Sequence, residues 1–148
     1  MPSSNRNYNE PLFLFHCAGQ TPDTFFVKTF SGKNEISRLY DFDILLHSKD
    51  KDISCEELIN SHASLFIYRN GKYHAYSGII ADFRFIDISD SYTTYRAILV
   101  PQLWYLTLTK QTRIFQKMSV DQIIKQILDE AGLEAYYTFD LDTYNVLE

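Results

Sequence analysis

The sequence predicts a mainly β protein, an antiparallel barrel or sandwich followed by one late amphipathic α-helix. Aromatic residues make up 16% of the 148 residues, and Tyr and Phe favour pleated, half-buried strands. Short runs of alternating polarity are separated by turn residues, which is typical of antiparallel sheets. Helical periodicity is sustained only late in the chain, so the strand–helix alternation of nucleotide-binding α/β folds is missing.

Length, charge and cysteine content exclude several classes of protein. A chain of 148 residues suits one ordinary domain. The net charge of −5 comes without a basic stripe, which argues against nucleic-acid binding. Two cysteines cannot support a disulfide scaffold. Residues 1–10 are polar, so we expect a flexible tail and no signal peptide there, and no apolar run approaches the length of a membrane-spanning helix.

The first half of the chain is interpreted as strands and turns. Residues 12–17 form a short apolar segment, and residues 25–30 are strand-like. Residues 31–34 (SGKN) predict a hairpin or bulge connection between strands. Residues 39–46 alternate, with Phe42, Ile44 and Leu46 on one face and Asp43 on the other. That alternation predicts a strand with one solvent-exposed face.

The middle of the chain contains the clearest local signals. Ser54 and Glu57 have the spacing of a capping box, which predicts a short helix after residue 54. Asn70-Gly71 lies between two strand-like runs, and this pair tolerates the positive φ angles of a type I′ hairpin. We expect the second strand of this hairpin to continue to Ile88. Residues 93–100 predict a further strand, ended by Pro101.

One helix is strongly predicted near the end of the chain. Ser119 and Gln122 have capping-box spacing, and Gly132 suits a left-handed C-terminal cap. Its apolar stripe consists of Val120, Ile123, Ile124, Ile127, Leu128 and Ala131. Residues 136–139 suggest another strand. The final Leu147-Glu148 resembles the remnant of a cloning site, which predicts a shortened chain.

The residues give no catalytic, cofactor-binding or metal-binding motif, so we predict none of these sites and no enzyme activity. Neither Gly32-Lys33 nor Gly71-Lys72 has the flanking residues of a phosphate-binding loop, and no G-x-S-x-G sequence occurs. The four histidines are His16, His47, His62 and His74. None of them, with Cys17 or Cys55, has the spacing of a zinc site, so packing or surface roles are favoured.

Two further groups of residues could have either a functional or a purely structural role. The acidic groups are Asp50, Asp52, Glu56 and Glu57, and later Asp140 and Asp142. They could act as a general acid and base, but a solvated loop and favourable charge at a helix N-terminus explain them better. The aromatic group is Phe83, Phe85, Tyr95 and Trp104. These rings could line a ligand cavity, and we favour packing inside a small barrel or against a partner chain.

Several segments in order resemble the N-terminal region of VgrG proteins, the spike subunits of bacterial type VI secretion systems. They are FVKTFSG (26–32), EISRLYDF (35–42), LI (58–59), ASLFI (63–67), SGII (77–80), YRAILVP (95–101), LWYL (103–106), RIFQ (113–116), SV (119–120) and II (123–124). Asn60 departs from the family, which usually has Gly after the preceding apolar pair. The chain also stops before the second barrel and the later domains of the family.

The resemblance implies an antiparallel β-barrel of the phage tail hub type. Residues 11–117 would form the first hub-like barrel, and residues 118–148 would begin an inserted second module that contains the helix at 119–131. In the family, such barrels form a trimeric ring with pseudo-sixfold symmetry. The isolated fragment would then expose interfaces and self-associate.

The implied function is structural: a subunit of the trimeric spike or hub of a contractile injection machine, linking the tube to the puncturing spike. The implied partners are other copies in a homotrimer, a hexameric Hcp-like tube protein, baseplate components and possible effectors, with no nucleic acid, small-molecule substrate or cofactor. The implied location is cytoplasmic assembly followed by delivery through the machine. A phage late-control or baseplate hub protein and, more distantly, a small-ligand-binding β-barrel are the alternatives.

Overall fold

A computed structural model describes residues 11–139. The expected N-terminal tail and the final Leu147-Glu148 lie outside this range. The chain divides into two compact units, Met1–Pro101 and Gln102–Glu148, and each is described by itself. Among residues 11–139, no helix is both long and apolar enough to cross a membrane.

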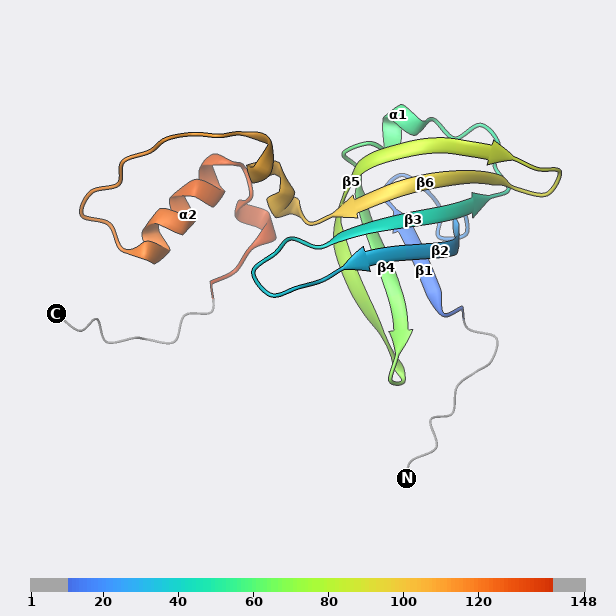
Figure 1. Cartoon of the computed structure of the whole chain (residues 1–148), viewed down its shortest axis with the longest axis horizontal. Helices are drawn as coiled ribbons and strands as arrows, with labels where there is room; N and C mark the ends of the chain where they lie inside the picture. The colour runs from blue at the N-terminus through green and yellow to red at the C-terminus, as the bar shows by residue number, and fades with distance from the viewer. Residues whose placement is uncertain (1–10, 140–148) are drawn as a thin grey trace, which may run out of the picture. The chain divides into compact units, whose positions relative to one another are not determined.

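The first unit, here the sheet unit, is one antiparallel sheet of six strands (Figure 1). The strands are β1 (Phe13–Cys17), β2 (Phe26–Lys33), β3 (Asp41–Ser48), β4 (His62–Arg69), β5 (Lys72–Ile88) and β6 (Thr93–Val100). Their order across the sheet is β1-β4-β5-β6-β3-β2. The mainly β, antiparallel fold that the sequence predicts is confirmed.

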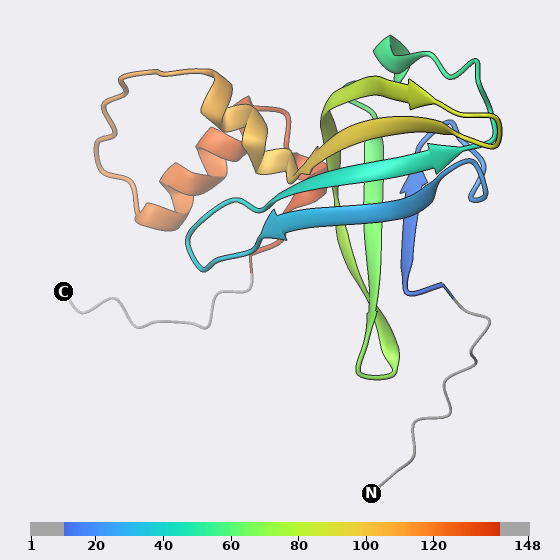
Figure 2. The same cartoon turned by 45° about the vertical axis from the view of Figure 1, so that its right-hand side comes forward.

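The 17-residue strand β5 joins the two halves of this sheet. Its first half pairs with β4 from Lys72 to Ile79, and its second half pairs with β6 from Ile79 to Ile88. Pairing with β6 shifts register between Ile80 and Asp82, and bulges of this kind bend a strand sharply. Figures 1 and 2 both show β5 curving so that β1 and β4 run across the direction of β6, β3 and β2.

The core lies on the concave face of the curled sheet. Alternate residues of β3 and β6 point into it, and Ile44, Leu46, Ala97 and Leu99 are fully buried there. From the other half of the sheet, β1 and β4 contribute buried apolar side chains of their own, Phe15 and Leu65 among them. The predicted alternation of β3 is confirmed, because its apolar residues are the ones that this core removes from water.

The hairpin between β4 and β5 also agrees with the sequence. Asn70 and Gly71 have φ angles of 54° and 82°, as a type I′ turn requires. A second close backbone approach involves Gly78, where an added Cβ would lie 1.9 Å from the carbonyl oxygen of Val100. Glycine at this position therefore lets β5 and β6 meet where the sheet bends.

Two local predictions were wrong, and a third was confirmed without its capping hydrogen bond. Residues 31–33 continue β2, because they pair with β3 as far as Lys33–Asp41, and the chain turns only after them. Helix α1 (Cys55–Leu58) does begin after Ser54, but the Ser54 side chain makes no capping hydrogen bond in this single turn. The strand expected at residues 136–139 is absent: a 3₁₀ turn, η2 (Glu134–Tyr136), occupies its start.

The second unit, here the helical unit, contains η1 (Gln102–Leu108), α2 (Val120–Glu130) and η2. The predicted helix is confirmed at both ends. The Gln122 side chain accepts a hydrogen bond from the backbone N–H of Ser119 at 3.0 Å, and Gly132 has a φ angle of 70°. Of the described residues in this unit, only Leu128 and Leu133 are buried.

Candidate functional site: the edges and outer face of the sheet

The histidines are dispersed over the sheet unit. His16 packs against the ring of Phe66 on the outer face, with ring centroids 5.0 Å apart, and His47 stacks on Tyr92 at 5.3 Å. His62 begins β4, and His74 lies opposite Ile67 on β5. Within residues 11–139, no three His, Cys, Asp or Glu side chains gather as a metal would require.

Cys17 is a buried residue of β1. Its Sγ lies 3.2 Å from the Ser61 hydroxyl oxygen. Burial raises the pKa of this thiol, and the Ser61 hydrogen bond offsets that only in part. A thiol with a raised pKa stays protonated, which makes it a poor nucleophile.

The acidic residues between β3 and α1 organise their own loop. The Asp50 backbone N–H donates to the Ser48 hydroxyl at 3.1 Å, and the Asp52 N–H donates to the Asp50 carboxylate at 3.0 Å. Asp50 and Asp52 are both exposed, which supports the solvated-loop interpretation. Asp140 and Asp142 lie outside the described residues.

The aromatic residues that might have lined a ligand cavity separate into different environments. Phe83 and Tyr95 are buried and stacked, with ring centroids 5.4 Å apart, and Phe25 packs edge-on against both. These three rings belong to the hydrophobic core. Phe85 is 53% exposed, and Trp104 lies in η1 of the helical unit.

The outer face of the sheet carries a bidentate ion pair. The Arg96 guanidinium of β6 donates two hydrogen bonds to the Asp43 carboxylate of β3, at 2.8 and 2.5 Å. These hydrogen bonds lower the pKa of Asp43. Thr29, Phe30, Ser31 and Leu45 surround the pair in a shallow hollow of about 280 Å³. Arg96 and Asp43 neutralise each other in this hollow, and their two hydrogen bonds join β6 to β3.

The two terminal strands of the sheet, β1 and β2, approach each other without pairing. The rings of Phe13 on β1 and Phe30 on β2 have centroids 5.0 Å apart, but no ladder joins these strands among the described residues. The sheet is therefore a curled half-barrel held at its seam by side chains. β2 leaves an exposed edge with Lys28, Lys33 and a bulge between Val27 and Thr29.

The helical unit has a groove of about 700 Å³ between η1 and α2. Tyr105, Leu106, Phe115 and Ile127 contribute its apolar lining. An ion pair between Arg113 and Glu130 borders it. Further along, the hydroxyl of Tyr137 donates to Asp129, and this bond raises the pKa of Tyr137 to about 12.

The apolar stripe of α2 is only partly covered. Val120 is 72% exposed and Ile124 is 43% exposed, although both lie on the predicted stripe. The sequence identified the stripe, but nothing in the pattern showed which of its residues would be covered. Likewise, alternation placed Asp43 on the solvent side of its strand, but only the register of β3 against β6 brings it to Arg96.

These features define a class of protein: a β-rich contact module with a filled core, open strand edges and exposed apolar residues. The sequence profile of the phage tail baseplate hub (GPD) family matches residues 33–148. The chain belongs to this family.

Individual relatives agree with the family match. The chain is 30% identical over 116 residues to the type VI secretion system spike protein VgrG1a of Pseudomonas aeruginosa, covering 78% of this chain and 18% of that protein. It is 36% identical over 118 residues to VgrG4b of the same species, covering 79% and 14%. The actin cross-linking toxin VgrG1 of Vibrio cholerae is 30% identical over 128 residues, covering 80% and 12%. The resemblance to VgrG proteins is thus confirmed.

A solved structure gives the same result. The E. coli c3393 protein, described as a component of the type VI secretion system with structural similarity to the T4 bacteriophage tail proteins gp27 and gp5, superimposes with a TM-score of 0.69 at 27% identity. The match covers 78% of this chain and 31% of that one. The chain therefore spans less than a third of this structure and less than a fifth of the three relatives named above.

Proposed function

We propose that the chain is part of a structural subunit of the trimeric spike or hub of a type VI secretion machine, linking tube to puncturing spike. The observation that carries the proposal is the curled six-stranded sheet, in a chain that matches VgrG1a in sequence and a type VI secretion component of E. coli in fold, each over 78% of its length. Open strand edges and exposed apolar side chains suit a body that bears load through contacts with neighbours.

The proposed partners are further copies in a homotrimer, a hexameric Hcp-like tube protein, baseplate components and effectors. The proposed location is assembly in the cytoplasm followed by delivery through the machine. The chain itself has no enzymatic role in this proposal, which is supported by its ring-filled interior and paired outer-face charges. The toxin named among the relatives shares only 12% of its length with this chain.

A phage tail hub is the second candidate, because the matching family is named for phage tail baseplates and the E. coli structure is described as similar to phage tail proteins. The two candidates share a fold and differ in the machine that contains it. Both require the sheet unit to support a trimeric assembly.

A segment exchange tests the proposal and separates the two candidates. The region of P. aeruginosa VgrG1a that aligns with this chain is replaced by this chain's residues, and the matched control receives the corresponding segment of VgrG4b. We expect the exchanged spike to form trimers and to support secretion of the tube protein, as the control does. Trimers without secretion would favour a phage-type hub. Loss of trimers, with the control intact, would contradict the hub role.

A further inference from the structure

The loop between β2 and β3 carries the most exposed large apolar side chain of residues 11–139. Ile36 is 97% exposed there. Its turn is closed by a hydrogen bond that the Arg38 N–H donates to the Glu35 carbonyl oxygen at 3.3 Å. Figures 1 and 2 both show the loop projecting beyond the ends of the two strands that it joins. We call residues 35–38 the Ile36 turn.

The Ile36 turn holds a strained backbone conformation. Ser37 has a φ angle of 63°, in the left-handed region that is unfavourable for residues other than glycine. A hydrogen-bonded turn with a positive φ at its third residue ordinarily has Gly or Asn there. Strained residues of this kind cluster at sites that make functional contacts. The turn therefore presents Ile36 in a defined position, as a contact residue requires.

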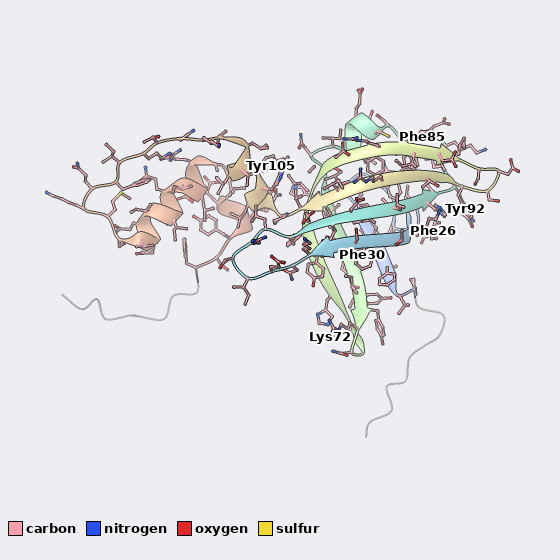
Figure 3. All side chains as sticks on the ribbon, viewed as in Figure 1. Phe26, Phe30, Lys72, Phe85, Tyr92 and Tyr105 are labelled. Atoms are coloured by element: carbon pink, nitrogen blue, oxygen red, sulfur yellow. The ribbon has the colours of Figure 1, made fainter. Side chains whose placement is uncertain are left out.

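The groove between η1 and α2 is an apolar surface that suits such a side chain. Its lining includes Tyr105, which is labelled in Figure 3, together with Leu106, Phe115 and Ile127. The volume of about 700 Å³ falls in the range of pockets that enclose whole small molecules. The groove thus has room for the Ile36 side chain together with the tip of its turn.

The charges beside the turn complement the charges beside the groove. Glu35 and Arg38 flank Ile36 and form an ion pair at 3.4 Å, with side chains 49% and 77% exposed. Arg113 and Glu130 form the ion pair that borders the groove. A turn seated in the groove with Glu35 beside Arg113 also brings Arg38 beside Glu130, so opposite charges meet on both sides. The reversed orientation would bring like charges together, so the two ion pairs select one orientation of the turn.

We propose that the Ile36 turn of one copy inserts into the groove between η1 and α2 of a neighbouring copy. Each copy then gives one turn and receives one, which is a heterologous, head-to-tail contact. Such contacts close into a ring when successive copies are related by a suitable rotation. The proposal rests on the proposed spike or hub function for closure at three copies, and it names residues that would join them. One turn in one groove is a small interface, so the isolated chain should associate weakly.

Sedimentation equilibrium of the 148-residue chain from micromolar to millimolar concentration tests the contact. We expect the mass of the native sequence to rise with concentration towards that of three chains. Ile36→Asp places a charge in the apolar groove, and we expect it to raise the dissociation constant at least tenfold. Val120→Asp is the matched control, because Val120 is 72% exposed in α2 and lies outside the groove lining. Its dissociation constant should stay within a few-fold of the native value, and circular dichroism establishes that each variant is folded.

Mixing two defective variants tests the head-to-tail arrangement. Ala131 is an exposed residue of the groove lining, so Ala131→Trp fills the groove and leaves the Ile36 turn intact. Neither Ile36→Asp nor Ala131→Trp should associate with itself. In the mixture, the native turn of the second variant meets the native groove of the first, and we expect a 1:1 dimer that grows no further.

Three results would overturn the proposal: a native chain that stays monomeric at millimolar concentration, association that Ile36→Asp leaves unchanged, or a mixture that fails to associate. The exchanged spike described above separates this contact from the hub role. If Ile36→Asp leaves the thermal stability of that trimer unchanged, the contact is absent while the hub role stands. Loss of the trimer with Ile36 in place would contradict the hub role itself.

Discussion

The sheet unit and the helical unit bury their apolar residues to very different extents. In the sheet unit, β3 and β6 alone supply several fully buried side chains, including Ile44, Leu46 and Leu99. In the described part of the helical unit, Leu128 and Leu133 are the only buried residues, and Val120 and Ile124 of its helix are largely exposed. Burial of apolar area is the main stabilising term in folding, so the sheet unit is the stable body of this chain.

This contrast shows that a helix whose ends match the sequence signals does not by itself make a stable unit. Helix α2 has a capping interaction at one end and a glycine in the left-handed region at the other. Most helical stability in proteins nevertheless comes from packing of the apolar face. The sheet unit, in contrast, closes a core between its two halves.

Gly78→Ala should produce the largest loss of stability in the sheet unit. The added Cβ would lie 1.9 Å from the Val100 carbonyl oxygen, a backbone atom that cannot move without separating β5 from β6. We expect a loss of about 4 kcal/mol or more in the free energy of unfolding, measured by urea denaturation.

Gly71→Ala is the control for this substitution, because nothing lies within 4 Å of its added Cβ and only its φ of 82° opposes a side chain. Gly71→Ala should lower the free energy of unfolding by about 1–2 kcal/mol. Equal effects of the two substitutions would contradict the close approach of β5 and β6.

Leu46→Ala and Leu128→Ala compare the two units directly. Leu46 is fully buried in the sheet core, and its truncation should lower the free energy of the main unfolding transition by about 3 kcal/mol. Leu128 is 8% exposed in the helical unit. Its truncation should leave that transition unchanged, because the helical unit is a separate compact unit. The transition is followed by near-ultraviolet circular dichroism. If Leu128→Ala also lowered the free energy of the main unfolding transition, the two units would unfold together.

Removing the Asp43–Arg96 ion pair should change the free energy of unfolding least among these substitutions. The hydrogen bonds from Arg96 lower the pKa of Asp43 in the folded state, so the pair stabilises the fold above the ordinary carboxyl pKa. This contribution is lost as the pH falls through the lowered pKa. Both side chains are 38% exposed, so Asp43→Asn should cost less than about 1 kcal/mol at neutral pH.

The pH dependence of the unfolding free energy tests the contribution of this ion pair. The difference in unfolding free energy between Asp43→Asn and the native chain should shrink below about pH 4. A difference that persists unchanged at lower pH would mean that the pair contributes through packing rather than charge.

Local chemistry explains which parts of the fold could be predicted from the sequence. The Asn70-Gly71 turn and the strand at residues 93–100 were predictable because their signals involve near neighbours only. The end of β2 was not, because the ladder with β3 overrides the turn preference of residues 31–33. The Arg96–Asp43 pair was not predictable, because it depends on the register between β3 and β6, two strands far apart in the sequence.

Hydrogen exchange of the 148-residue chain tests the contrast between the units most directly. Amides of β3 and β6 should exchange only through global unfolding, whereas amides of α2 should exchange through local opening at least about a hundredfold faster. Protection of α2 equal to that of β6 would contradict the account of a stable sheet unit beside a weakly packed helical unit.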